Sequence, residues 1–344
     1  MLSGDLERFV TEVFLKMGMP HEDALWTART ITQSELRGVA THGVIRLPYY
    51  VRRFESGLMN RSPNIRVLKD AGPIALLDGD NGMGQVVSKR AMEECISRAR
   101  VHNVGIILLK ESNHFGVAAT YALMAADQGM VGLCTTNTFP VMAPAGGRQP
   151  LIGNNPIAIA VPGDPPIVLD FALSTVARGN INVAAQAGKS IPEGWGVDAD
   201  GRSTTDPHAI LNGGSLSPIA FHKGSGLSIV IDAILGTLGG GGYGYEGKGL
   251  MDLSGLMHVT HLFGAIRVDA LVSLTDFHHS VTAFATLLRQ SPKAAGTERI
   301  LMPGEKELES ERTLAKEGIP LSPERQRELA KLADSLGISR LQTF

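Results

Sequence analysis

The chain has 344 residues, a formal net charge of −2 and 43% apolar residues. This length allows two compact units with sizeable cores, and the apolar content excludes a disordered chain. The near-neutral charge excludes the basic field that holds nucleic acid or anionic membranes, and no apolar stretch is long enough for a membrane span. Cys95 and Cys134 lie in apolar surroundings, which argues against a disulfide framework. We therefore expect a cytoplasmic protein without a nucleic-acid or membrane partner.

The first part of the chain predicts a mostly helical unit. Apolar residues there recur at the spacing of one helix face, and a loop containing His42 interrupts the pattern. The expected helices are 2–18, 22–38 and 47–57, with a charged terminal helix over 321–336. We expect the last helix to pack on the first ones, so that the helical unit comprises residues 1–65 joined by about 306–344.

The remaining residues, 66–305, predict an α/β unit. Short apolar runs bounded by Gly, Pro, Asn and Asp indicate buried strands: IALLDGD, VGIILLK, GLCTTN, PIAIAVP and PIVLDFAL. Helices are expected over 84–103, 116–129, 224–238 and 276–290, a further strand over 263–273, and irregular chain over 180–216. This alternation of strands and helices is typical of an α/β fold.

Two apparent motifs fail on context. The segment from Gly242 to Gly247 fits the G-x-G-x-x-G dinucleotide pattern, but its glycines follow a helix instead of a strand. We expect a mobile loop there. His258 and His261 lack the Glu and the spacing of a zinc-protease helix, so no metal is expected.

The segment RGVATHGVIR places His42 and Arg46 together. Reduction of a C=O or C=N bond needs a proton donor near the product atom and a cation for a substrate carboxylate. His42 follows a threonine and precedes a glycine, and an imidazole ordinarily titrates near neutrality. Arg46 can fork onto a carboxylate, and Thr41 could fix the imidazole tautomer. The residues alone fit a surface histidine and a surface arginine equally well.

Further candidate segments follow apolar runs or open helices. Polar loops at the carboxyl ends of strands are where ligands bind in α/β sheets. Ser112 or Asn113 could cap the helix that follows and direct its amides to a phosphate, or be a plain cap. Lys223 opposes the dipole at a helix start, so a ligand role is more credible for it than for an average lysine. These segments are 112–116, 169–175, 221–226 and 302–305.

Taken together, these clusters resemble the malate/L-lactate dehydrogenase family of the second type. That family includes ureidoglycolate dehydrogenase, 2,3-diketo-L-gulonate reductase and the Δ1-piperideine-2-carboxylate/Δ1-pyrroline-2-carboxylate reductases. The resemblance covers nearly the whole chain, through RGVATHGVIRLPYYVRRFESG, LLDGDNGMGQ, SNHFG, IGNNPIAIAVP, GWGVDADG, HKGSGLSIVIDAILG and MPGE. It implies a non-Rossmann NAD(P)-binding fold and a homodimer with its sites near the subunit interface.

The resemblance also implies roles for residues. His42 matches the family's acid/base histidine and Arg46 its substrate arginine, while His114 matches the histidine proposed as catalytic in the ureidoglycolate enzymes. In the cyclic imine reductases a serine and an aspartate form a relay with the histidine; here Thr41 and Asn180 stand at those positions, and asparagine supplies no negative charge. The residues that match cofactor-binding segments are His114, Phe115, Gly116, Val117, Ala118, Asp170, Phe171, Ala172, Leu173, Ser174, Thr175, His222, Lys223, Pro303, Gly304 and Glu305.

We therefore predict an NAD- or NADP-dependent oxidoreductase that moves a hydride to or from C2 of a small 2-oxo or 2-hydroxy carboxylic acid. Two alternatives stay open. One is a cyclic imino acid reductase, because HKGSG resembles the imine and diketogulonate reductases more than the malate enzymes. The other is a binding protein that has lost its chemistry, against which the presence of both His42 and Arg46 speaks.

Overall fold

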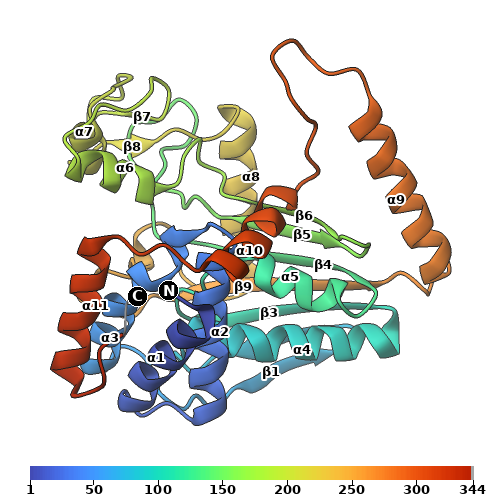
Figure 1. Ribbon diagram of the computed structural model, residues 1–344, viewed down its shortest axis with the longest axis horizontal. Coiled ribbons are helices and arrows are strands. Elements are labelled where there is room, and N and C mark those ends of the chain that lie inside the picture. The colour runs from blue at the N-terminus through green and yellow to red at the C-terminus, as the bar shows by residue number, and fades with distance from the viewer. Residues whose placement is uncertain (342–344) are drawn as a thin grey trace.

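A seven-stranded sheet forms the centre of the computed structural model, which describes residues 1–341 (Figure 1). The strands run in the order β1-β2-β3-β9-β4-β5-β6, and within this sheet only β2 and β3 are parallel neighbours. Their bounds are β1 Arg66–Ala71, β2 Ile74–Asp78, β3 Val104–Ser112, β4 Met130–Thr136, β5 Ile157–Val161, β6 Ile167–Phe171 and β9 Val259–Arg267. The predicted strand at 263–273 thus begins and ends earlier, as β9, and it lies in the middle of the sheet.

Two helices, α4 (Gly84–His102) and α5 (Ala119–Ala126), pack on the sheet through a shared apolar core. The approach of α4 is very close at Gly105 of β3, where a Cβ atom would lie 2.0 Å from the backbone oxygen of Cys95. Only glycine fits this contact, because real Cβ atoms do not approach backbone oxygens so closely. The helix can therefore lie directly on the strand that leads to His114.

The N-terminal helices and the last helix share one core. They are α1 (Ser3–Lys16), α2 (His21–Leu36), α3 (Leu47–Glu55) and α11 (Pro323–Leu336). Leu329 and Ala333 of α11 are buried in the same cluster as Leu6, Phe14 and Phe54. Helix α11 therefore packs on the N-terminal helices. Helix α10 (Glu305–Glu317) was not predicted, because none of its residues is buried and it lacks an apolar face to detect.

Between β6 and β9 the chain forms smaller elements. The segment predicted to be irregular, 180–216, instead contains most of α6 (Arg178–Gln186), with α7 (Pro207–Leu211) and the paired strands β7 (Gly196–Val197) and β8 (Ser215–Leu216). Helix α8 (His222–Asp232) continues into a π-helical turn, η3 (Ala233–Leu238). The glycine segment then follows as a loop with one 3₁₀ turn, η4 (Gly244–Glu246), which confirms that it is no dinucleotide fingerprint.

Helix α9 (Leu274–Gln290) projects from the rest of the molecule and leads into a long loop (Figure 1). Ala285 is the one buried residue of this helix, while Phe284 and Leu287 are 55% and 66% exposed. A single amphipathic helix is not expected to stand alone in water, because its stability comes from packing of its apolar face. Among residues 1–341 no helix is long and apolar enough to cross a membrane.

Candidate active site

His42 and Arg46 lie on two short 3₁₀ turns, η1 (Ala40–His42) and η2 (Val44–Arg46), directly before α3. The side chain of Arg46 reaches back, and its Nε donates to the backbone oxygen of Thr41 at 2.7 Å. Glu35 of α2 accepts the backbone N–H of Val44 at 2.8 Å and so holds the second turn in place. The predicted histidine and arginine are therefore fixed relative to one another by backbone contacts.

His114, from the loop after β3, stacks on His42. The ring centroids are 5.5 Å apart with 13° between the planes. Each ring has a hydroxyl at Nδ1: Thr41 Oγ1 lies 3.0 Å from His42 Nδ1, and the Tyr50 hydroxyl lies 2.7 Å from His114 Nδ1. The predicted contact between Thr41 and His42 is thus present. The tertiary structure places both candidate histidines in one site.

The surroundings favour the neutral form of both imidazoles. Both residues are half-buried. Loss of water around the ring, helped by the positive charge of Arg46, lowers the pKa of His42 to about 4. Burial, followed by the nearby His42 and Arg46, holds the pKa of His114 well below its usual value. The expectation that His42 titrates near neutrality therefore does not hold for the ligand-free protein.

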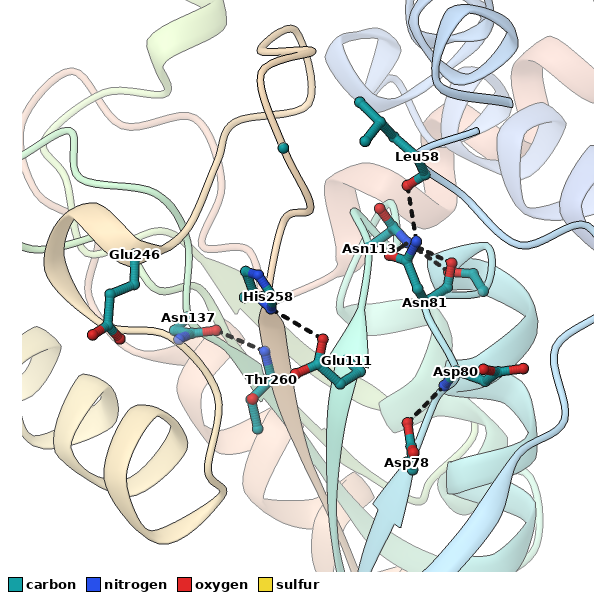
Figure 2. A network of polar contacts seen from close by, with 12 residues as sticks. Leu58, Asp78, Asp80, Asn81, Glu111, Asn113, Asn137, Glu246, His258 and Thr260 are labelled. Atoms are coloured by element: carbon teal, nitrogen blue, oxygen red, sulfur yellow. Dashed lines mark hydrogen bonds and ion pairs between the residues drawn. The ribbon is translucent and has the colours of Figure 1, made fainter. Parts of the chain in front are cut away.

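The loop that carries His114 is fixed by an amide network (Figure 2). The Asn113 side chain donates to both oxygens of Asn81, at 3.0 and 3.1 Å, and Asn81 donates to the backbone oxygen of Leu58 at 3.1 Å. Asn81 has φ +51° and Glu111, across from it, φ +50°. Non-glycine residues adopt this conformation at a cost, and such strain is concentrated at functional sites. Two non-glycine residues with positive φ therefore lie beside the loop that carries His114.

The expectation that Ser112 or Asn113 caps the next helix is wrong. Helix α5 begins only at Ala119, and the carboxylate of Asp170 accepts the backbone N–H of Ala119 at 2.8 Å. Ser112 instead hydrogen-bonds Nε2 of the buried His261 at 2.7 Å. The polar residues before His114 support the loop from within, and the cap comes from a distant strand.

The predicted cofactor segments lie along β6 and the chain that follows it. The carboxylate of Asp170 accepts the N–H of Ala119, just after the first segment, and Val168 N–H donates to the backbone oxygen of Pro303 at 2.9 Å. Ile219 and Ser217, which precede the segment 221–226, make backbone hydrogen bonds of 2.9 and 2.8 Å with Leu173 and Thr175. Segments far apart in the sequence therefore border one region of the molecule.

The residues in this region fit a dinucleotide. Thr175, His222 and Lys223 are exposed, and the latter two form the first turn of α8. A lysine, a histidine and a hydroxyl beside a helix N-terminus form a donor set for phosphate oxygens. No cluster of three or more His, Cys, Asp or Glu able to hold a metal is found in the described part of the chain.

Asn180 does not extend the contacts of His42. It lies on α6, whose neighbouring Gly179 comes close to the side chain of Thr41, but the Asn180 side chain is exposed. Within residues 1–341, His42 Nδ1 is hydrogen-bonded to Thr41 and Asn180 makes no hydrogen bond with the ring. The chain of contacts behind His42 therefore ends at Thr41.

Sequence reasoning missed Tyr50, Gln85, His261 and Arg53. Tyr50 stands one helical turn after Arg46, which was the available signal for it. Gln85 lies in LLDGDNGMGQ, with nothing in the sequence to connect it to Tyr50. The guanidinium of the fully buried Arg53 donates to the backbone oxygens of Asp252 and Gly255 at 2.8 and 3.1 Å, and so connects the loop between η4 and β9 to α3.

A histidine pair beside an arginine, next to a region suited to a dinucleotide, has the groups that a dehydrogenase needs. The family model for malate/L-lactate dehydrogenase matches residues 3–330. The chain is 38% identical to malate dehydrogenase of Pyrococcus horikoshii over 97% of its own length and 94% of that protein's. The solved structure of that enzyme covers 99% of this chain and 96% of its own, with a TM-score of 0.92.

Two further relatives carry other names. L-sulfolactate dehydrogenase of Methanocaldococcus jannaschii is 36% identical over 97% of this chain and 96% of its own length. The structure of Δ1-piperideine-2-carboxylate reductase from Pseudomonas syringae is 28% identical, covers 97% of this chain and 99% of its own, and has a TM-score of 0.84. The chain belongs to the malate/L-lactate dehydrogenase family and is an enzyme, which sets aside the non-catalytic alternative.

Proposed function

We propose that the protein transfers a hydride between NAD or NADP and C2 of a small 2-oxo or 2-hydroxy carboxylic acid. The observation that carries this proposal is Arg46 beside the stacked pair of His42 and His114. Arg46 uses Nε for its backbone contact, and no carboxylate of residues 1–341 faces it. Its two terminal nitrogens are left to bind a substrate carboxylate as a fork.

The residues divide the chemistry as follows. When bound, the nicotinamide takes hydride from C2 or supplies it. Arg46 orients the substrate, so that its C2 oxygen lies at the histidine pair. In oxidation, neutral His42 takes the hydroxyl proton as the C2–H bond breaks, and the product is the 2-oxo acid. In reduction, protonated His42 returns that proton to the oxygen. The low pKa of His42 makes the base form ready in the free enzyme.

A 2-hydroxy acid fits better than a cyclic imino acid. In the resemblance to imine reductases, the histidine has a carboxylate behind it, whereas here Asn180 is exposed and makes no contact with His42. The deciding experiment is a panel of pyruvate, oxaloacetate, sulfopyruvate and Δ1-pyrroline-2-carboxylate, each with NADH and NADPH, followed by nicotinamide absorbance. Turnover of the pyrroline acid alone would favour the imine reductase instead.

Replacing Arg46 tests the carboxylate fork. We expect Arg46→Lys to raise KM for the acid strongly and to leave the Kd of NAD(P)H nearly unchanged, because lysine keeps the charge but cannot make two parallel hydrogen bonds. Steady-state kinetics and a fluorescence titration of NAD(P)H measure the two quantities. Equal losses of substrate and cofactor binding would show that Arg46 has a structural role.

Lys223 tests the cofactor region. Because this lysine is exposed at the first turn of α8, Lys223→Ala should leave the fold intact and weaken NAD(P)H binding. The loss of one exposed charge–phosphate contact is expected to raise Kd by about tenfold, or roughly 1.4 kcal/mol. An unchanged fluorescence titration in a variant with a native circular dichroism spectrum would remove Lys223 from the site.

The proposed enzyme is a homodimer. Helix α9 exposes Phe284 and Leu287, and α8 exposes Leu227, Ile229 and Val230, which are 41–52% accessible. Groups of exposed apolar side chains are typical of protein interfaces. Light scattering should give twice the mass of one chain, and Leu287→Glu should shift it toward one chain. The matched control is Val101→Glu, at an exposed apolar position of α4, which should stay dimeric.

A further inference from the structure

Tyr50 connects the catalytic loop to the first turn of α4. Its side chain is fully buried on α3. Gln85 Nε2 donates to the Tyr50 oxygen at 3.1 Å, and that oxygen lies 2.7 Å from His114 Nδ1. Burial raises the pKa of Tyr50 to about 12, so the phenol keeps its proton at all working pH values. Three side chains from three elements thus form one hydrogen-bonded row that ends on His114.

The protons in this row can be counted. A phenol has one proton to give. Among residues 1–341 its oxygen has two hydrogen-bond partners, and because Gln85 is a donor, His114 Nδ1 is the partner left to accept the Tyr50 proton. Nδ1 must then act as an acceptor. His114 is neutral, because burial and the nearby His42, Arg46 and His261 all disfavour its charged form. A neutral imidazole that accepts at Nδ1 carries its proton on Nε2.

From this row we infer that Gln85 and Tyr50 are positioning residues that hold His114 as the Nε2–H tautomer, a neutral hydrogen-bond donor to the C2 oxygen of the substrate. The inference rests on the proposed function for the identity of that oxygen. In reduction, hydride adds to C2, negative charge develops on the oxygen, and the His114 N–H stabilises it without giving up its proton. His42 transfers the proton. The two stacked histidines therefore have different tasks.

The burial of Gln85 supports this assignment, because the buried amide lowers the stability of the fold. The residue is fully buried, and its Oε1 has no hydrogen-bond partner among the described residues. A buried acceptor without a partner destabilises the fold, and an apolar side chain of similar size would avoid that loss. The backbone oxygen of Gln85 is held separately, by Trp26 Nε1 at 2.9 Å, so the backbone does not need the amide. Within residues 1–341 the side chain of Gln85 makes one hydrogen bond, and that bond is to Tyr50.

The tautomer can be read directly. Protein labelled with 15N at histidine gives well-separated signals for protonated and unprotonated ring nitrogens, and His114→Asn assigns the His114 pair by its disappearance. We expect an unprotonated Nδ1 and a protonated Nε2 at pH 7 in the ligand-free enzyme. A protonated Nδ1, or a charged ring, would overturn the inference. No substrate is present, so this outcome is independent of which acid the enzyme uses.

Two variants link the tautomer to the reaction. Tyr50→Phe removes the proton that Nδ1 accepts, so a second tautomer should appear and kcat should fall about 10- to 100-fold, less than the 10²–10³ lost when such a donor is removed outright. KM and cofactor Kd should change little. Gln85→Glu places a carboxylate that can accept the hydrogen bond of the Tyr50 hydroxyl. The Tyr50 oxygen is then free to accept from His114, which should shift His114 toward the Nδ1–H tautomer. Tyr49→Phe, one residue away, is the control and should alter neither the spectrum nor kcat.

The same variants separate positioning from packing. A fall in kcat in Tyr50→Phe with an unchanged His114 spectrum would mean that Tyr50 acts through packing alone, and the inference would fail. Turnover of a different substrate class, with the spectrum as expected, would contradict the proposed function but leave the tautomer assignment standing. Should Tyr50→Phe not fold, the wild-type spectrum and Gln85→Glu still decide.

Discussion

His42→Asn should lower kcat by about two to four orders of magnitude, the range for loss of a general acid or base, with NAD(P)H binding retained. Asparagine keeps the approximate size of the ring but cannot exchange a proton near neutral pH. The measurements are kcat with the best acid of the panel and a fluorescence titration of the cofactor. His114→Asn retains an N–H donor, so its loss should be smaller. Near-normal kcat in His42→Asn together with abolished kcat in His114→Asn would reverse the two roles.

The pH profiles carry the signature of His42. Its pKa of about 4 in the free enzyme means that the base form is present throughout the neutral range. For oxidation, kcat/KM should therefore be level from about pH 6 to 8 and fall as pH drops toward the pKa, because the base becomes protonated. For reduction, kcat/KM should fall about tenfold for each unit that the pH rises over the same neutral range, because the protonated form of His42 becomes scarcer. His42→Asn should abolish both dependences, whereas His114→Asn should keep them.

Gly84→Ala should impair folding and activity together. A Cβ atom at Gly84, the first residue of α4, would lie 2.3 Å from the backbone oxygen of His114 and 2.4 Å from that of Asn113. Backbone atoms cannot rotate away, so the helix or the catalytic loop must move. We expect the free energy of unfolding to fall by about 3 kcal/mol, the upper end for overpacking, and kcat to fall in the protein that remains folded. Denaturant titration measures the free energy of unfolding. The measured kcat is then divided by the fraction of the variant that is folded and active.

The matched control is Gly4→Ala on α1. A Cβ atom there meets nothing within 4 Å, and Gly4 is exposed. Alanine in a helix is favoured over glycine by up to about 1 kcal/mol, so stability should stay level or rise slightly. Equal stabilities for the Gly84 and Gly4 variants would show that α4 and the His114 loop adapt to each other.

Local elements with a repeating apolar pattern or clear end signals could be predicted from the amino-acid sequence alone. Helices α1 to α4 and the buried strands followed from periodicity and bounding glycines, and the failed context of the Gly242 segment excluded a Rossmann fingerprint. His42, Thr41 and Arg46 are close in sequence, so their mutual contacts could also be anticipated from one short segment. Helix α10 was missed because none of its residues is buried. The elements α6, α7 and β8 do contribute core residues, but they and β7 are too short to show a repeating apolar pattern.

Features that depend on contacts between distant segments could be established only from the folded chain. The insertion of β9 between β3 and β4, the stacking of His114 on His42 and the contact of Gln85 with Tyr50 join positions separated by tens to more than a hundred residues. The low pKa of His42 belongs to the same group, since it arises from the protein that encloses the ring and not from its sequence neighbours alone. Periodicity and spacing describe one element at a time, whereas burial and electrostatics depend on everything packed around a group, and that packing exists only in the folded chain.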